Sequence, residues 1–202
     1  MPRIAGQIDV SKNEAILDAA MEALGERGVS VSMDEIARRA GVSKQTVYNH
    51  YGSKADLVRA LAKRRVDDIT APLAGPDAAE NPAEALAGYA RVLLNAAFAP
   101  KGSGLFRTAM LHASDMPDVA RAMWEAGPRA SRVRLAEFLI LETRAGRLFC
   151  PNPQEAAEFF GGMVTGTYQT AMLLGVELNL DDARIDRIAT EAAFRFMRAY
   201  AA

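Results

Sequence analysis

Six side chains that can hydrogen-bond lie close together between residues 44 and 50. Gln and Asn can pair with the base edges of DNA, Thr can hydrogen-bond or touch a thymine methyl, and Lys, Tyr and His can meet phosphates. No acidic residue interrupts the segment. These residue types therefore indicate a segment that contacts a groove of DNA. The six residues are Lys44, Gln45, Thr46, Tyr48, Asn49 and His50.

The residues before this segment predict a short helix that ends at a tight turn. Ser32 is a predicted N-cap, and Glu35, three residues on, could reach back to the free amides of the first turn. Gly41 can adopt the left-handed backbone conformation that ends a helix.

The segment itself predicts a second short helix, which begins after a cap at Ser43. Val47 and Tyr51, at positions i and i+4, would face the first helix and leave the polar side chains on the opposite face. This geometry is typical of a helix-turn-helix whose second helix enters a groove of DNA. Many helical hairpins are packing units with solvated polar faces, and the hairpin alone leaves both interpretations open.

A helix is predicted on each side of the hairpin. The upstream helix spans residues 11–28, with a capping box formed by Ser11 and Glu14. The downstream helix begins at Ser53, which also acts as a cap. Lys54 in its first turn opposes the helix dipole, and a DNA phosphate would explain this position.

Residues 11–61, with VSMDEIARRAGVSKQTVYNHYGSKADL at their centre, resemble the DNA-binding domain of the TetR/AcrR family of bacterial transcriptional regulators. The capping residues, the Gly-Val-Ser turn and the Gly-Ser-Lys entry occur in the family's order and spacing. The resemblance implies that Gln45, Thr46 and Asn49 read bases. It implies that phosphates are positioned by Ser43, Lys44, Tyr48, His50 and Lys54.

Two features depart from the family pattern. Tyr51 stands where the family usually has Phe, which should leave the packing intact. Before the first helix the arm offers Arg3 and then Lys12, and it includes Asp9, so minor-groove contacts are not expected from it.

Charge is distributed unevenly along the 202 residues. Residues 1–65 hold 11 Lys and Arg against 8 Asp and Glu, a net +3, and residues 66–202 hold 13 against 17, a net −4. The basic part is at the N-terminus, which agrees with a predicted DNA-binding domain over residues 1–65 followed by a second domain over residues 66–202. The basic excess is small, so DNA affinity would depend on a few placed side chains and on dimerisation.

Composition bears on the other function classes. No apolar run is long enough to span a bilayer, there is no charged-then-apolar leader, and the lone Cys150 fits a reducing cytoplasm. Paired carboxylates, a metal-ligand cluster and a phosphate-binding loop are missing from the sequence, so neither an enzyme nor a cofactor or metal is predicted. An activity that depends on Cys150 would restore the enzyme alternative. A protein-interaction module with an inactive helix-turn-helix is the other alternative.

Helical periodicity continues to the end of the chain, so an all-α fold is predicted. A Pro- and Gly-rich junction covers residues 70–82. Beyond it, predicted helices span residues 83–99, 104–114, 117–127, 129–145, 154–175 and 181–200, and Gly127-Pro128 is expected to stop the third helix.

The stretch 154–175 has more apolar surface than one face of a monomer needs. Gly161, Gly162 and Gly166 each cost about 1 kcal/mol relative to Ala in the middle of a helix, and close approach of another backbone would compensate for them. In the TetR/AcrR family the last two helices of each subunit form an intersubunit four-helix bundle, so the resemblance implies a homodimer. The alternative is that these glycines lie against a helix of the same subunit.

The resemblance also implies a ligand cavity among the central helices, where a lipophilic or aromatic effector would bind and release the protein from DNA. Taken singly, each large apolar candidate is more typical of ordinary core than of a pocket wall. The candidates on predicted inward faces are Phe98, Phe106, Met110, Met123, Trp124, Phe138, Phe159, Met163 and Tyr168, and the polar candidates that would orient a ligand if buried are Arg107, His112 and Gln169. Together these expectations describe a homodimeric, ligand-responsive repressor that binds a palindromic double-stranded operator and has no membrane partner.

Overall fold

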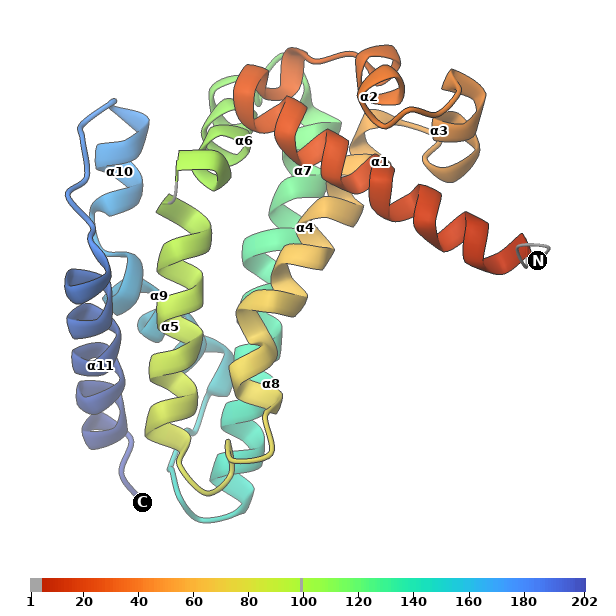
Figure 1. Cartoon of the computed structure of the whole chain (residues 1–202). Coiled ribbons are helices and arrows are strands. Elements are labelled where there is room, and N and C mark those ends of the chain that lie inside the picture. The colour runs from red at the N-terminus through yellow and green to blue at the C-terminus, as the bar shows by residue number, and fades with distance from the viewer. Residues whose placement is uncertain (1–4, 99) are drawn as a thin grey trace. The chain divides into compact units, whose positions relative to one another are not determined.

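The computed structural model describes residues 5–98 and 100–202, with the side chains of 10–98 and 104–202. In the described residues the fold is all-α, as predicted, and the one extended pairing recorded there is an isolated bridge between Leu148 and Ala201. Figure 1 labels the helices. They are α1 (Ala5–Arg27), α2 (Met33–Arg39), α3 (Lys44–His50), α4 (Lys54–Thr70), α5 (Pro82–Phe98), α6 (Pro100–Leu111), α7 (Pro117–Trp124), α8 (Ala130–Arg144), α9 (Pro153–Thr165), α10 (Tyr168–Leu173) and α11 (Asp182–Ala199).

Three short helical segments connect these helices. The segments η1 (Gly28–Ser30) and η2 (Ala71–Ala74) are 3-10 turns, and η3 (Glu125–Arg129) is π-helical. The chain divides into two compact units. Unit 1 comprises residues 1–63 and 100–126, and unit 2 comprises residues 64–99 and 127–202.

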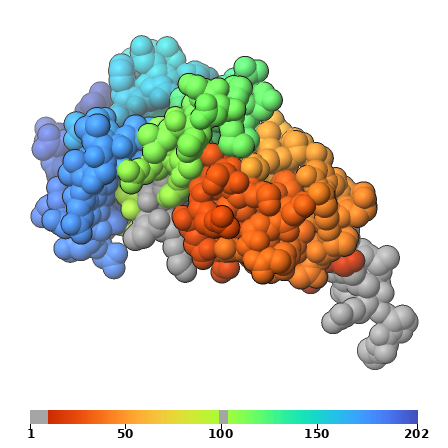
Figure 2. All heavy atoms as spheres, turned by 90° about the horizontal axis from the view of Figure 1, so that it is seen from above, coloured from red at the N-terminus to blue at the C-terminus, as the bar shows by residue number. Residues whose placement is uncertain are grey.

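Unit 1 holds the predicted helix-turn-helix. Its core is formed by residues that the sequence periodicity directs inward from α1, α2, α3 and α4, with further contributions from α6 and α7. Helix α6 packs along α1 and η1, and Figure 2 shows the green segment that follows residue 103 directly against the red and orange N-terminal helices. The fully buried side chains in this core include Ile16, Leu24, Ile36, Val47, Leu57 and Leu61.

Unit 2 is a helical bundle in which α5 packs on α11 and α8 packs on α9 (Figure 1). Aromatic rings dominate its centre: Phe160 of α9 makes an edge contact with Phe196 of α11 at 5.1 Å between centroids. The Tyr89 ring of α5 lies 6.1 Å from that of Phe160. The ion pair of Arg91 with Asp186, at 2.6 Å, joins α5 and α11 at the surface.

The expected start of the first helix is wrong. Helix α1 begins at Ala5, so Ser11 lies inside it rather than at its cap. Of the arm residues, Arg3 lies outside the described residues, and for Asp9 the backbone alone is described. Residues 5–10 are therefore part of α1 and not an arm that precedes it.

The expected stop at Gly127-Pro128 is also wrong. These residues lie within η3, and the chain stays helical from Pro117 to Arg144. Proline has no N–H to donate, and the wider π turn accommodates it without ending the helix.

The single helix expected over residues 154–175 is two helices. Gly166 has φ +46°, a conformation that favours glycine, and it ends α9 while its N–H donates to the carbonyl of Gly162. A Cβ at Gly161 would collide with the guanidinium of Arg132 on α8, so the close neighbour here is a side chain of the same subunit. Around Gly162 the same position is open, with nothing within 4 Å.

Replacing Gly104 with Ala tests the contact between α1 and α6. A Cβ at Gly104 would lie 2.5 Å from the carbonyl oxygen of Gly25, and backbone cannot move aside as a flexible side chain can. We expect Gly104→Ala to lower the free energy of unfolding by about 1–3 kcal/mol, measured by denaturant titration. Gly52→Ala is the control, because its Cβ would meet its nearest atom at 3.7 Å. A Gly104→Ala variant as stable as the wild type would contradict this close packing.

Candidate nucleic-acid interface

The caps of the helix-turn-helix form as predicted. The Ser32 hydroxyl accepts a hydrogen bond from the amide of Glu35 at 3.2 Å, and the Ser43 hydroxyl accepts one from the amide of Thr46 at 3.0 Å. Gly41 has φ +65°, which confirms the left-handed turn between the two helices. Local chemistry therefore sets where α2 ends and where α3 begins.

The Glu35 carboxylate does not complete the capping box. It accepts hydrogen bonds from Arg38 at 2.7 Å and from Arg39 at 3.0 Å, and Arg39 also binds Glu26 of α1 at 2.7 Å. The bonds from Arg38 and Arg39 lower the pKa of Glu35 from its ordinary 4.5 to about 2. Arg38 and Arg39 thus form ion pairs within α2, and Arg39 also joins α2 to α1.

Helix α3, the reader helix, is anchored by two residues on its inner face. Val47 is fully buried, and the Tyr51 side chain that follows the helix is 8% exposed. The Tyr51 hydroxyl donates to Oδ1 of Asn13 on α1 at 2.5 Å. Replacement of the family's usual Phe therefore leaves the packing intact, as expected, and adds a polar bond to α1.

The opposite face of the reader helix presents the predicted polar residues to the surface. Gln45 and Asn49 are both exposed, and Nε2 of Gln45 donates to Oδ1 of Asn49 at 2.8 Å. Tyr48 is 40% exposed. The Thr46 and Ser43 hydroxyls lie 2.8 Å apart, so one bonds the other, and His50 is half-buried beside the Tyr51 ring.

Two predicted phosphate-binding lysines have partners in the protein. Lys44 donates to the carboxylate of Asp34 at 2.8 Å, and this hydrogen bond raises the pKa of Lys44. The half-buried Lys54 donates to the carbonyl of Val29 at 2.8 Å, and burial lowers its pKa. That carbonyl gives Lys54 a structural reason to occupy the first turn of α4, although an ammonium has three donors and can also bind a phosphate. Asp34 was not predicted, because ten residues separate it from Lys44.

Family models match both parts of the chain. The model described as bacterial regulatory proteins of the tetR family matches residues 16–61, which include the whole helix-turn-helix. The model described as the C-terminal domain of AefR-like transcriptional repressors matches residues 84–202, more than half of the chain. The chain belongs to the TetR family of transcriptional regulators. The predicted family and the predicted function class are therefore confirmed.

Individual TetR-family relatives span nearly the whole chain. The transcriptional regulator BetI of Rhizobium meliloti is 28% identical over 189 residues, which is 90% of this chain and 87% of BetI. A crystal structure of a TetR-family regulator from Mesorhizobium loti has a TM-score of 0.80 and 25% identity, covering 96% of this chain and 98% of that one. The flavonoid-responsive regulator FrrA has a TM-score of 0.69 and 32% identity, covering 98% of both chains.

The enzyme alternative fails because the relatives of this TetR-family chain are regulators. Cys150 is buried, and burial raises the pKa of its thiol, which disfavours a nucleophilic thiolate. Within residues 5–98 and 100–202, no helix has the length and apolar character needed to cross a membrane.

The predicted effector residues differ in where their side chains lie. Trp124, Phe159 and Met163 are 56%, 56% and 41% exposed, so the expectation that they face inward is wrong. Arg107 and His112 are also exposed, and Nδ1 of His112 lies 3.3 Å from the Asp115 carboxylate on the same surface. Arg107, Trp124, Phe159 and Met163 lie on faces of α6, α7 and α9 that this subunit leaves exposed, and His112 follows the end of α6.

The remaining effector candidates are divided between the two units. In unit 1, Met123 is buried, and Phe106 and Met110 are half-buried. In unit 2, Phe138 is buried in the core and Gln169 is exposed.

Two candidates in unit 2 contact each other. The rings of Phe98 and Tyr168 meet edge to face, with their centroids 5.9 Å apart. This contact joins the end of α5 to the start of α10. Both residues are half-buried, so they are more accessible than the Phe138 side chain.

Substitution of Asp34 by Asn tests the pairing of Lys44 at the interface. The change removes a negative charge beside the reader helix and frees Lys44, so we expect tighter DNA binding, with a gain that shrinks as salt rises. Fluorescence anisotropy with labelled duplex at two salt concentrations measures this effect. Glu137→Gln, at an exposed position on α8, controls for the change in net charge. Unchanged affinity would mean that the Asp34 carboxylate does not compete with phosphate.

Proposed function

We propose that this TetR-family regulator is a repressor that binds a roughly palindromic operator as a homodimer and is released by a small lipophilic or aromatic effector. The observation that carries the proposal is the reader helix, which is held by buried Val47 and turns exposed Gln45 and Asn49 outward. The match of residues 84–202 to the AefR-like repressor model supports the repressor role.

Base reading requires a rearrangement on the reader helix. An Asn or Gln amide pairs with adenine through both its oxygen and its nitrogen, but Gln45 Nε2 and Asn49 Oδ1 bond to each other. Both residues are exposed, so exchanging this bond for bonds to bases leaves no buried group unpaired. The proposed base contacts are therefore accessible at the cost of one surface hydrogen bond.

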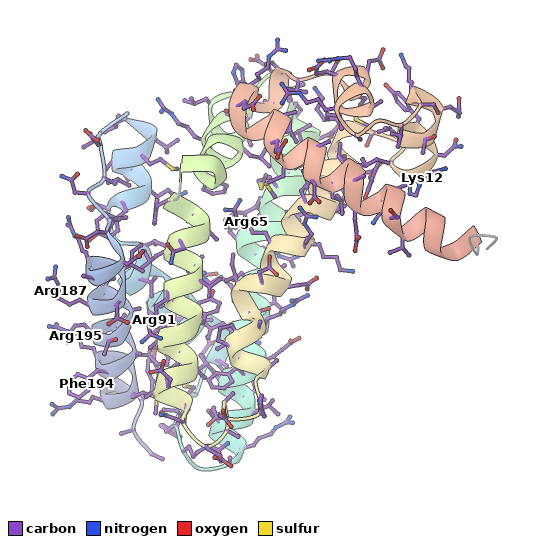
Figure 3. The ribbon with its side chains drawn as sticks, viewed as in Figure 1. Lys12, Arg65, Arg91, Arg187, Phe194 and Arg195 are labelled. Carbon is purple, nitrogen blue, oxygen red and sulfur yellow. The ribbon has the colours of Figure 1, made fainter. Side chains whose placement is uncertain are left out.

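The proposed dimer interface lies on the outward faces of α9 and α11, which pack on each other in unit 2. Phe159 and Met163 of α9 and Phe194 of α11 are large apolar side chains that this subunit leaves 41–56% exposed. Figure 3 shows Phe194, Arg187 and Arg195 on the side of α11 that faces away from α5. A second copy of the chain would cover this apolar surface.

Charge and backbone access also favour a second copy at this surface. The exposed part of α9 has Glu155 and Glu158, of which Glu158 pairs with Arg132. On α11 the exposed Asp186 and Glu191 pair with Arg91 and Arg195, so Arg187 and Arg198 are the arginines offered to the α9 face of another subunit. Gly162 is exposed and lies four residues after Glu158 on α9, and the open space around it leaves the α9 backbone accessible to a neighbouring helix. We infer that Gly162, rather than Gly161, is the position of close intersubunit approach.

The proposed effector site in unit 2 centres on Phe98 and Tyr168. Their edge-to-face pair is half-buried, and Met172, a flexible side chain, is buried on the same short helix as Tyr168. Aromatic and thioether side chains suit a planar aromatic ligand. The relative FrrA is described as flavonoid-responsive, which supports a polyphenolic or similar aromatic effector for this chain.

Helix α4 is continuous from the helix-turn-helix into unit 2, so it can transmit the effect of a bound effector to the reader helix. It begins at Lys54 beside the reader helix and enters unit 2 at Arg64, where Arg65 donates to the carbonyl of Ala96 on α5. An effector releases DNA by binding the released conformation better than the DNA-bound one, with a typical coupling of about 1–3 kcal/mol.

The proposed function is tested by binding to DNA from upstream of the protein's own gene. The measurement compares this fragment with an unrelated fragment of equal length at two salt concentrations, before and after addition of a panel of flavonoids and simple phenols. Salt-sensitive, sequence-preferring binding that one of these compounds abolishes supports the proposal. Absence of preference at either salt would favour the alternative of a helical dimer that binds a protein partner.

Alanine at Gln45 or Asn49 tests the base readers. We expect each substitution to reduce discrimination between operator and unrelated DNA by about 1–3 kcal/mol, because it removes a bidentate bond to a base. The readout is the ratio of the two dissociation constants, not the affinity for either fragment alone. Asn179→Ala, at an exposed amide in unit 2, is the matched control. Full discrimination in both reader variants would assign base recognition to other residues.

Leucine at Gly162 tests the proposed dimer contact. Within one subunit the new side chain has open space, and the helix gains about 1 kcal/mol of intrinsic propensity, so the monomer should fold normally. We expect weaker dimerisation by analytical ultracentrifugation and a parallel loss of operator affinity. Glu137→Leu on exposed α8 controls for an added surface leucine. An unaltered dimer dissociation constant would move the interface away from Gly162.

A further inference from the structure

We propose that Lys12 of α1 binds a DNA phosphate beside the end of the reader helix, and that the hydrogen bond between Tyr51 and Asn13 holds Lys12 in position. The inference rests on the proposed function, because it requires α3 to enter a groove of DNA. It adds α1 to the DNA-binding surface, through its own helical residues and not through a flexible arm.

The bond from Tyr51 to Asn13 connects α1 to the last turn of the reader helix. The amide of Tyr51 donates to the carbonyl of Val47 at 2.8 Å, so Tyr51 closes α3. Its hydroxyl reaches Oδ1 of Asn13 at 2.5 Å, and its ring is almost fully buried. A phenylalanine at this position would fill the same space without the bond, so the hydroxyl contributes orientation beyond packing.

Lys12 is the neighbour of Asn13 and is exposed. Figure 3 shows it on the stretch of α1 that runs beside α3. In the described part of the chain, no hydrogen bond or ion pair engages its ammonium, whereas Lys44 binds Asp34 and Lys54 binds Val29. Lys12 therefore needs no exchange of partners before it can bind an anion.

The helical backbone fixes the direction of Lys12. Helix α1 begins at Ala5, so Lys12 lies about two turns inside it. Consecutive residues of an α-helix differ by a fixed rotation of about 100°, and a bond that fixes the face of Asn13 also fixes the face of Lys12. A cation on a fixed helix beside the groove-entering helix is positioned for the duplex backbone, where most protein–DNA hydrogen bonds are made.

Alanine at Lys12 is the direct test, with the full-length protein and the operator fragment from its own upstream DNA. Removal of one phosphate-binding ammonium per subunit should lower affinity for operator and unrelated DNA by the same factor. The plot of log affinity against log salt has a negative slope, and its magnitude should fall by about one for each phosphate that Lys12 no longer neutralises. Lys12→Arg should restore both values. Arg121→Ala, an exposed position on α7 of unit 1, removes the same charge as a control.

A double-mutant cycle tests the positioning role of Tyr51. When Lys12 is present, Tyr51→Phe should weaken DNA binding and reduce the magnitude of the slope of log affinity against log salt. In the Lys12→Ala background it should have no further effect. Loss of reader-helix stability alone would weaken both backgrounds equally and leave the salt slope unchanged. That outcome would overturn the positioning role.

The results separate this inference from the proposed function. If the wild type binds operator and Lys12→Ala matches the Arg121→Ala control in salt slope, the Lys12 contact is overturned while the repressor proposal stands. If the wild type binds neither fragment, the proposed function fails, and the contact between Lys12 and DNA fails with it.

Discussion

Burial of Val47 is the contact on which the DNA-binding surface depends. The reader helix has seven residues, and isolated helices shorter than about 12–15 residues are marginal in water. Its stability must therefore come from packing, and Val47 is its fully buried side chain. Because Val47 faces the unit 1 core, where α3 packs on α2, the residues on the other side of this short helix are turned to solvent. The same contact thus creates the helix and selects the face that can meet DNA.

The predicted DNA-binding surface has few positive charges that are not paired with a carboxylate. Residues 1–65 have only a small basic excess, and some of their cations already have partners, since Lys44 binds Asp34 and Arg39 binds both Glu35 and Glu26. DNA phosphates must compete with carboxylates for some of these cations, so the net electrostatic gain from each subunit is small. In the proposed homodimer, the linkage of two reader helices raises the effective local concentration of the second one, which would compensate for weak binding by each. The charge pattern and the proposed dimer therefore support the same mode of binding.

Local chemistry made much of the unit 1 fold predictable. The caps at Ser32 and Ser43, and the turn at Gly41, depend on atoms within three or four residues, and each formed as expected. Ser11 misled because a serine followed by a glutamate can also lie inside a longer helix, as it does in α1. The polar face of α3 was predictable from spacing, whereas the partners of Lys44 and Tyr51 were not. Both partners lie on other helices, and no local pattern encodes that contact.

The glycines of α9 show why residue type alone could not identify the interface or the effector site. Gly161 makes room for the Arg132 side chain, Gly162 borders open space, and Gly166 supplies the backbone conformation that ends the helix. From the sequence, all three glycines could be explained by the close approach of another backbone. In the structure each glycine has a different role. The aromatic residues present the same difficulty. Helical spacing predicts that a side chain faces inward, but it does not distinguish a core residue from one that faces a ligand. What distinguishes Gly162 is that its own subunit leaves the space beside it unfilled, and this open space is the reason for placing the proposed dimer contact there.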